Sequence, residues 1–361
     1  MGMIFLLMPK VYNNQFPDLT TFRVQLFQES PIFLQRNEMN AIEVSHLRRV
    51  YRAQIGVFNR SVKEVVAVED ISFDVKEGEL FGLLGPNGAG KTTTVKMLTT
   101  LLIPSRGTAR VAGFDVVKQA NEVRKRIGFI FGGERGLYWR LSGDDNLRYF
   151  ASLYGVDPAV SKKRIPFLME LVGLQGRGSE RVGGYSRGMK QRLHVARTLL
   201  HDPDILFLDE PTIGLDPVGA REFRSVMLNL QSEKKTILLT THYMFEADAL
   251  SDRIAIINKG QVIALDTPDG LKQHVSDLSV VEVETFGASE SAIEKLRLLP
   301  FVDALSVEDR EQKQILLVQT TRGAEAVPDV MAALDGQRVG RVIVREPTLE
   351  DAYVRLVGDN S

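Results

Sequence analysis

The stretch Gly85-Pro86-Asn87-Gly88-Ala89-Gly90-Lys91-Thr92-Thr93 decides the fold of this chain. It satisfies the pattern G-x-x-x-x-G-K-[ST], in which glycines let successive backbone N–H groups converge on phosphate oxygens. The apolar run at 80–84 predicts a buried strand before it, and 91–102 predicts a helix after it. The loop then lies at the positive end of a helix, where phosphates bind. We therefore predict a nucleotide-binding loop in which Lys91 reaches the β- and γ-phosphates and the Thr92 hydroxyl ligates Mg²⁺.

Length and composition bound the classes of protein that remain. A chain of 361 residues has room for two domains, and 44% hydrophobic residues are enough for ordinary cores. The net charge of −1 gives no overall basic field for nucleic acid, and the lack of cysteine excludes disulfides, thiolate metal sites and cysteine nucleophiles. No apolar run approaches the roughly 20 residues that cross a bilayer, and the run at 3–8 is also too short for a signal peptide. We expect a globular protein of the cytosol that does not span a membrane by itself.

The order of predicted elements divides the chain into three parts. Residues 1–40 hold prolines and asparagines without sustained periodicity, which predicts a poorly ordered N-terminal extension. Across 41–266, short apolar runs alternate with amphipathic segments, which is typical of an α/β domain with a parallel core sheet. The predicted strands of that sheet are 80–84, 127–131, 205–208, 237–239 and 254–257. After a turn-rich joint, 267–361 follows the order strand, helix, strand, strand, helix, strand, so we expect a small α+β, ferredoxin-like accessory domain there.

Two adjacent acids close one of these strands. The apolar run 205–208 leads directly into Asp209 and Glu210. A buried strand has no structural use for neighbouring carboxylates at its tip, although a strand that simply leaves the core for a polar loop would look the same in isolation. With the phosphate-binding loop upstream, we predict that Asp209 holds Mg²⁺ through its water shell and that Glu210 orients and deprotonates an attacking water.

A third segment, Tyr185-Ser186-Arg187-Gly188-Met189, opens a predicted helix ahead of the acids. Ser186 suits the N-cap of that helix, and a purely structural cap is the alternative interpretation. Read together with the two motifs above, the segment resembles the signature of ABC transporter ATP-binding subunits, a Leu-Ser-Gly-Gly-Gln-like stretch ahead of the acidic strand. The resemblance extends over about 41–266. It implies an ABC-type P-loop NTPase with a helical subdomain at about 133–202, which binds ATP and Mg²⁺ and hydrolyses ATP to ADP and phosphate in a reaction coupled to transport.

The resemblance implies further site residues. In the family, the segment 211–217 resembles the loop that passes between two subunits, with Asp216 as its interfacial carboxylate. His242 resembles the switch histidine that contacts the γ-phosphate. An aromatic side chain that stacks on adenine is expected upstream, and we predict Tyr51 for this role, with Phe58 as the second choice.

The signature segment also predicts a dimer. Because Ser186 and Gly188 start a different helix from the phosphate-binding loop, we expect them to contact the ATP of a second chain, so that two ATP molecules lie between two copies, or between this chain and a similar ATPase. Two departures from the family pattern affect the site. Gly132 stands where the family has a phosphate-sensing glutamine, and Arg187 and Met189 replace a glycine and a glutamine of the signature.

Two segments are similar to one branch of the family, the daunorubicin-resistance-type (ABC-2) exporter ATPases. One is Tyr-Ser-Arg-Gly-Met, and the other is Pro347-Thr348-Leu349-Glu350-Asp351, which can also be a helix entry capped by Thr348 with Asp351 at the third helical position. The branch implies a peripheral ATPase subunit at the cytoplasmic face of the cell membrane. That subunit powers export of an unidentified substrate, a drug, lipid or similar, through a separate integral-membrane permease. We expect the surface at 132–146 to dock on the permease. Tyr138 and Trp139 either fill that contact or belong to the core.

Two other functions stay open. A soluble ABC-type ATPase acting on nucleic acid or ribosomes is the alternative, but no tandem ATPase halves, long coiled coil, zinc-binding cysteines or basic face are visible, so no nucleic-acid partner is expected. The other is a regulatory protein that binds ATP without turning it over, and the presence of Glu210 argues against it.

Overall fold

The computed structural model describes residues 40–55, 61–131, 136–275, 277–310 and 313–358. The chain divides into the units Met1–Glu38 and Met39–Ser361, and all described residues belong to the second. The predicted extension, apart from its last residue, lies outside the described residues, as do Phe58 and Gly132.

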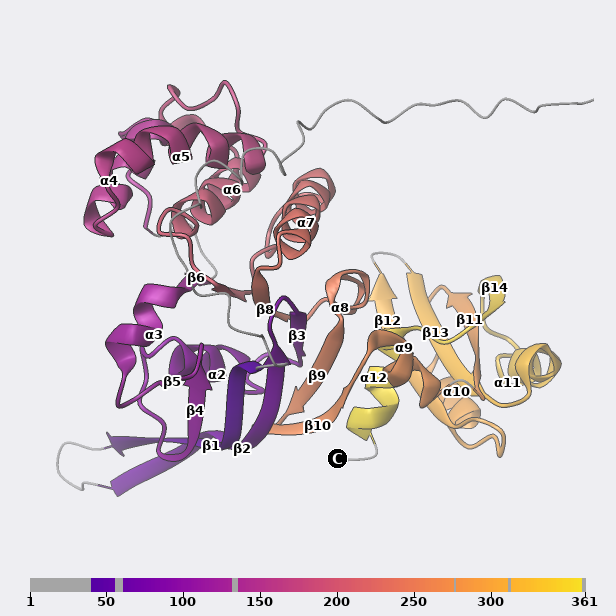
Figure 1. Ribbon diagram of the computed structural model, residues 1–361. Coiled ribbons are helices and arrows are strands. Elements are labelled where there is room, and N and C mark those ends of the chain that lie inside the picture. Colours follow the sequence, from indigo (N-terminus) through magenta and orange to yellow (C-terminus); the bar gives the residue numbers. More distant parts are fainter. Residues whose placement is uncertain (1–39, 56–60, 132–135, 276, 311–312, 359–361) are drawn as a thin grey trace, which may run out of the picture. The chain divides into compact units, whose positions relative to one another are not determined.

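A mixed sheet carries the phosphate-binding loop (Figure 1). Its ten strands among the described residues have the order β5-β4-β1-β2-β10-β9-β3-β8-β7-β6. The parallel part consists of β9 (Arg253–Asn258), β3 (Leu80–Leu84), β8 (Thr236–Thr241), β7 (Ile205–Asp209) and β6 (Ile127–Phe131). On β7, Leu206 and Leu208 pack into one core, and Ile205 and Phe207 pack into another on the opposite face. Both faces of the parallel part are therefore covered, as the continuous apolar runs predicted.

The other half of the sheet was not predicted as an antiparallel layer. It is formed by β1 (Asn40–Ile55), β2 (Ser61–Lys76), β4 (Arg106–Val111), β5 (Phe114–Asp115) and β10 (Gln261–Asp266). β1 runs antiparallel to both β2 and β4, and β10 runs antiparallel to β9. β1, β2 and β4 alternate between a buried and a solvated face, so they lack the continuous apolar run by which the parallel strands were recognised. The expectation of a parallel sheet holds for the core alone.

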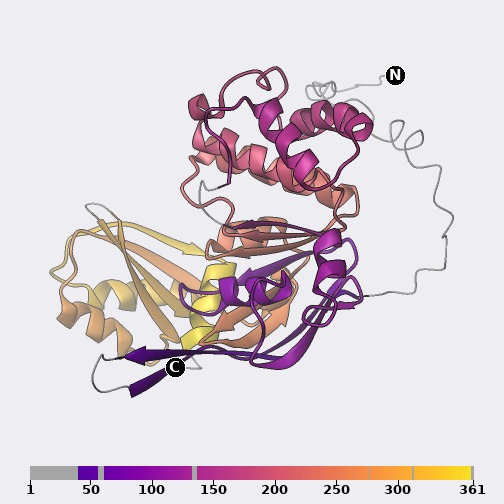
Figure 2. The same cartoon turned by 90° about the vertical axis from the view of Figure 1, so that its left-hand side faces the viewer.

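Five of the eight described α-helices of this part of the chain begin at a side-chain cap. The bounds of the eight are α2 (Lys91–Leu98), α3 (Ala120–Arg126), α4 (Gly143–Leu153), α5 (Pro158–Leu171), α6 (Arg187–Thr198), α7 (Pro217–Ser232), α8 (Met244–Leu250) and α9 (Pro268–Gln273). At the five capped helix starts a side chain accepts a hydrogen bond from a backbone N–H of the first turn. The capping residues of α4, α5, α6, α7 and α9 are, in that order, Ser142, Asp157, Ser186, Asp216 and Thr267. In both views α4, α5 and α6 form one group of helices (Figures 1 and 2).

A second, four-stranded sheet follows in the chain. Its elements are β11 (Ser279–Thr285), α10 (Glu290–Arg297), β12 (Ala304–Arg310), β13 (Lys313–Thr320), α11 (Val327–Ala333) and β14 (Val339–Arg345). Within the described residues the strand order is β12-β13-β11-β14, all antiparallel, and α10 and α11 share a core with the sheet. The order of strands and helices is the one expected from the sequence. The boundary near residue 266 stays a prediction.

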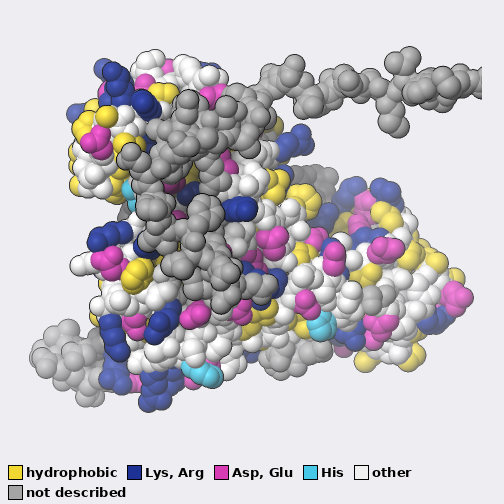
Figure 3. All heavy atoms as spheres, viewed as in Figure 1, with side chains coloured by type: hydrophobic (Ala, Val, Ile, Leu, Met, Phe, Trp, Pro, Cys, Tyr) yellow, Lys and Arg dark blue, Asp and Glu magenta, His cyan; other side chains and the backbone are white. Residues whose placement is uncertain are grey.

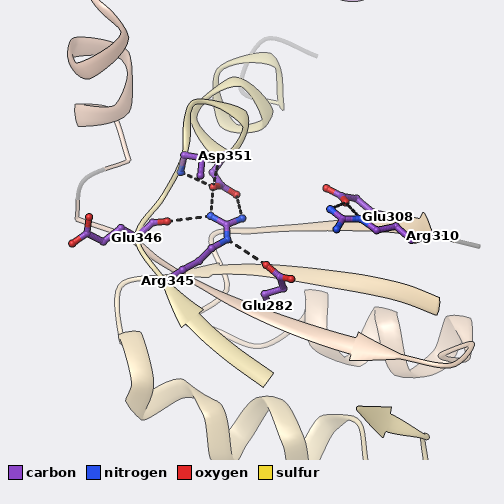
Figure 4. Close-up of polar contacts among 7 residues, drawn as sticks. Glu282, Glu308, Arg310, Arg345, Glu346 and Asp351 are labelled. Carbon is purple, nitrogen blue, oxygen red and sulfur yellow. Dashed lines mark hydrogen bonds and ion pairs between the residues drawn. The ribbon is translucent and has the colours of Figure 1, made fainter. Parts of the chain in front are cut away.

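The last helix, α12 (Leu349–Gly358), returns to the first sheet. Leu349 is buried in a cluster with Leu84 and Ile256, and the helix contacts α8, α9 and β10. Asp351 anchors the start of the helix (Figure 4). Its carboxylate accepts hydrogen bonds from the Arg345 guanidinium at 2.6 Å and from the Thr348 backbone N–H at 2.7 Å. Burial alone would raise the pKa of Asp351, but these hydrogen bonds to the charged form outweigh it and the pKa is lowered.

Candidate functional site

The loop between β3 and α2 has the backbone that its glycines predicted. Gly88 and Gly90 have φ of 83° and 109°, a region that side chains other than glycine rarely adopt. A Cβ atom on Gly85 would overlap the carbonyl oxygen of Ile257. The residues at the tip of the loop, Pro86, Asn87 and Gly88, are exposed, whereas Gly85, Ala89 and Gly90 are buried. The tip of the loop is therefore open to a ligand.

Lys91 holds a buried positive charge inside this loop. Its Nζ donates to the carbonyl oxygens of Gly85 at 2.7 Å and Pro86 at 3.2 Å. The same nitrogen lies 3.4 Å from Oε1 of Glu210. A cation held by uncharged carbonyls and one carboxylate at the start of a helix suits an incoming phosphate.

Thr92 and Asp209 present oxygen atoms side by side. The Thr92 hydroxyl donates to Oδ2 of Asp209 at 2.8 Å, and the Thr240 hydroxyl donates to Oδ1 at 2.6 Å. Hydroxyl and carboxylate oxygens are the ligands that Mg²⁺ prefers. Among the described residues, three or more His, Cys, Asp and Glu side chains do not gather at any point to enclose a metal ion. The pair fits Mg²⁺, because this ion usually binds through one or two protein oxygens and completes its shell with phosphate and water.

Glu210 occupies a strained position between two nitrogen-bearing side chains. Its φ is 50°, and its backbone N–H donates a hydrogen bond to the carbonyl oxygen of Thr240 at 3.0 Å. Oε2 of its carboxylate lies 3.4 Å from Nδ1 of His242, on the opposite branch from Lys91. Such a conformation costs roughly 1–3 kcal/mol and is typical of active sites. The ends of β3, β7 and β8 thus bring Lys91, Glu210 and His242 together, and their roles stay a prediction.

Ser186, Gly188 and Asp216 form a second group. Ser186 caps α6 through the Met189 N–H at 3.2 Å, and Asp216 caps α7 through the Gly219 N–H at 3.3 Å. A Cβ atom on Gly188 would lie 3.6 Å from Cα of Gly219, so two glycines let the two helix starts approach closely. The predicted residues of the signature and of the 211–217 loop are therefore neighbours within one chain.

Tyr51 lies on β1 opposite Val65 and is partly exposed. The guanidinium carbon of Arg49 lies 4.8 Å from the centre of its ring. The structure thus places the predicted adenine-stacking residue on the antiparallel half of the sheet, and its role stays a prediction.

The sequence interpretation missed two features of the site. The Thr240 hydroxyl donates a hydrogen bond to the Asp209 carboxylate and accepts one from the backbone N–H of Glu210. Its place at the end of a predicted strand, directly before Thr241 and His242, could have indicated a role in the site. The guanidinium of Arg187 lies over Gly214, where a Cβ atom would overlap it. Arg187 was noted only as a departure from the family signature, and nothing in the sequence indicates this contact.

Comparisons with known proteins agree on one family. The family model described as "ABC transporter" matches residues 68–213. The chain is 48% identical over 206 residues to the ABC transporter ATP-binding protein NatA of Bacillus subtilis, covering 57% of this chain and 84% of that protein. It is 38% identical to the daunorubicin resistance ATP-binding protein DrrA3 of Streptomyces coeruleorubidus, covering 81% and 92%. A solved dimeric structure of the ATP-binding cassette MJ0796 bound to ADP and Pi shares the fold, with a TM-score of 0.55 and 22% identity over 63% of this chain and 98% of that one.

The described helices include none that could cross a bilayer, since none combines the necessary length with sufficient apolar character.

Proposed function

We propose, from the premise that this chain belongs to the ABC transporter ATP-binding proteins, that two copies close on ATP to drive export through a separate permease. The chain is an ATP-binding subunit that hydrolyses ATP, related to drug-resistance exporter ATPases. The observation that carries the proposal is the meeting of Lys91, Thr92, Asp209, Glu210 and His242 at the ends of three neighbouring parallel strands.

Each of these side chains has a proposed task in hydrolysis. Lys91 binds the β- and γ-phosphates, and in doing so it gives up its contact with Glu210. Glu210 then orients the attacking water and takes its proton, while His242 contacts the γ-phosphate. Thr92 and Asp209 would hold Mg²⁺. When bound, that ion neutralises charge on the phosphate oxygens.

A second copy completes the site in this proposal. Ser186 and Gly188 are grouped with Asp216 at the starts of α6 and α7, and Ser186 is not bonded to the group around Lys91 within the described residues. We expect them to contact the ATP of the partner, in a head-to-tail homodimer or in a heterodimer with a similar ATPase. Loss of the γ-phosphate removes the charge that both chains hold, so the copies separate.

Glu210→Gln tests this mechanism directly. The variant should bind ATP but not cleave it, and it should therefore accumulate as an ATP-dependent dimer, measured by size-exclusion chromatography with light scattering. Lys91→Ala is the matched control, because it should lose ATP binding and stay monomeric. A Glu210→Gln protein that is monomeric in saturating ATP with Mg²⁺ would contradict the dimer.

Exposed aromatic side chains on α4 and in the turn before it supply the proposed permease contact. Trp139 and Tyr149 are exposed, and the rings of Tyr138 and Tyr149 pack edge to face with centres 4.9 Å apart. Exposed apolar clusters of this kind mark interaction sites. We therefore place the chain at the cytoplasmic face of the membrane as a peripheral subunit. Trp139→Ala should reduce co-purification with the permease while ATPase activity of the isolated chain is retained, and unchanged co-purification would move the contact elsewhere.

Export is favoured over action on nucleic acid. Neither curated relative described above has nucleic acid in its name, and one is named for drug resistance. Basic and acidic side chains are interspersed on the face shown in Figure 3 rather than gathered into a basic track. ATPase activity should therefore not respond to added DNA or RNA, and stimulation by either would revive the alternative.

A further inference from the structure

One face of α6 carries polar side chains toward the site. Arg187, Gln191 and His194 are spaced four and three residues apart, so they lie on the same side of the helix. All three line a cavity of about 10 Å³. Glu210 and Pro211 line the same cavity from the end of β7. Its remaining lining residues are Lys190, Ile213 and Leu215.

Buried nitrogen atoms at this cavity have no partner within the described part of the chain. They are Nε2 of Gln191, a residue that is 9% exposed, and both ring nitrogens of His194, which is 2% exposed. Leaving a buried polar group unsatisfied costs about 1–3 kcal/mol. Native proteins avoid such groups, so the combination indicates an occupant.

The chemistry of the lining specifies that occupant. Burial and the nearby charge of Arg197 lower the pKa of His194 to about 3, so the ring is neutral and offers one N–H donor and one bare acceptor nitrogen. The Gln191 amide nitrogen offers only donors. The occupant must therefore both donate and accept hydrogen bonds, and a volume of 10 Å³ is about that needed for the centre of one water molecule.

We propose that the cavity holds one ordered water molecule, which bridges Gln191 and His194 to the carboxylate of Glu210 and keeps that carboxylate in its productive orientation. The water accepts from the Gln191 amide and donates to the bare nitrogen of His194, and its second hydrogen remains for Glu210. A carboxylate has about four lone-pair sites, so this bond is compatible with the contacts to Lys91 and His242.

The water connects α6 to the carboxylate of Glu210 at the end of β7. The signature serine, Ser186, is the N-cap of α6, and the same helix would hold Glu210 through the water at Gln191 and His194, five and eight residues further on. Gln191 and His194 are therefore positioning residues, and the inference rests on the proposed role of Glu210 as the base. The charged groups facing the water are Arg187, Lys190 and Glu210, with Arg197 on the same helix.

The first test is structural. A crystal structure of the full chain, at a resolution that reveals ordered water, should contain one water within hydrogen-bond reach of Gln191 and His194. In His194→Leu this water should be absent. A dry cavity in the wild-type protein would overturn the proposal.

The second test separates positioning from folding. His194→Leu should lower kcat roughly tenfold or more, because a misplacement of about 1 Å can cost about 10²-fold in rate. ATP affinity and KM should stay unchanged. His194→Gln, which retains a donor and an acceptor, should keep kcat near the wild-type value. If His194→Leu does not fold, Gln191→Leu at the rim of the cavity should show the same loss of kcat.

The failure of this inference differs from the failure of the proposed function. If Glu210→Gln abolishes turnover and His194→Leu retains wild-type kcat, the water has no positioning role and the base assignment stands. If Glu210→Gln still hydrolyses ATP, the base assignment is wrong, whatever the crystal structure contains at the cavity.

Discussion

The anchor of α12 offers a sharp test of how burial sets the strength of an ion pair. Asp351 is 2% exposed and its carboxylate accepts four hydrogen bonds, of which the shortest comes from Arg345 at 2.6 Å. In Asp351→Ala the Arg345 guanidinium loses this partner. It is 27% exposed and keeps Glu282 at 3.4 Å, so water and a second carboxylate compensate it in part (Figure 4).

The expected size of the effect follows from this geometry. Removing one partner of a buried ion pair costs about 3–5 kcal/mol. Because Arg345 retains some compensation, we expect the lower end, about 3 kcal/mol. That energy holds the start of α12 against local opening, and every 1.4 kcal/mol is a factor of ten. The helix should therefore open roughly a hundredfold more often.

Hydrogen exchange of the amides in α12, followed by mass spectrometry, measures this opening. The matched control is Glu308→Ala. The Glu308–Arg310 ion pair is also 2.6 Å long, but the arginine is 64% exposed, so its loss should cost less than about 1 kcal/mol. The reasoning from burial would be refuted if the exchange rate of α12 were unchanged in Asp351→Ala. It would also be refuted if Glu308→Ala raised exchange around residue 308 as much as Asp351→Ala raises exchange in α12.

Three further outcomes are expected. Lowering the pH from 7 to 5 should reduce the free energy of unfolding of the wild type by about 2 kcal/mol more than that of His194→Gln. The His194 ring has a pKa of about 3 in the folded protein and near 6.5 in the unfolded chain, so between pH 7 and pH 5 only the unfolded chain gains a proton there. Denaturant titrations of both proteins at the two pH values measure this, and equal losses would mean that the ring is not buried neutral. Gly128→Ala should destabilise by about 1–3 kcal/mol, since its Cβ atom would overlap Thr198 and press on Leu206, and an unchanged Tm would show that β6 and α6 can move apart. Phe223→Ala should cost about 3–5 kcal/mol in chemical denaturation by opening a cavity in a fully buried core, whereas a loss below about 1 kcal/mol would indicate that the core collapses to fill it.

The grouping of the candidate site residues could be predicted from the sequence because these residues follow strand ends. Parallel strands present their carboxyl ends at one edge, so Lys91, Asp209 and His242 had to converge once their strands were recognised. Most of the antiparallel half of the sheet was missed for the opposite reason. One face of β1 and β2 is solvated, and their alternating pattern resembles polar loop sequence.

Contacts between distant segments were also beyond the sequence. An apolar stripe on 349–358 indicates that one face of that helix is buried, but not that it packs on the strand leading into the phosphate-binding loop. Likewise, a histidine on α6 has the same appearance in the sequence whether water, protein or solvent surrounds it. Only the placement of Glu210 and Pro211 across from His194 identifies the cavity.

The return of α12 to the first sheet has a consequence for biosynthesis. Leu84, Ile254 and Ile256 form an apolar surface whose cover, Leu349, is translated almost a hundred codons after the last of them. Until Leu349 leaves the ribosome, part of this apolar surface stays exposed in the nascent chain near the phosphate-binding loop. Transiently exposed apolar surface of this kind can bind chaperones or other nascent chains. A fragment ending at residue 266 would lack Leu349, so part of this apolar surface would stay exposed in it.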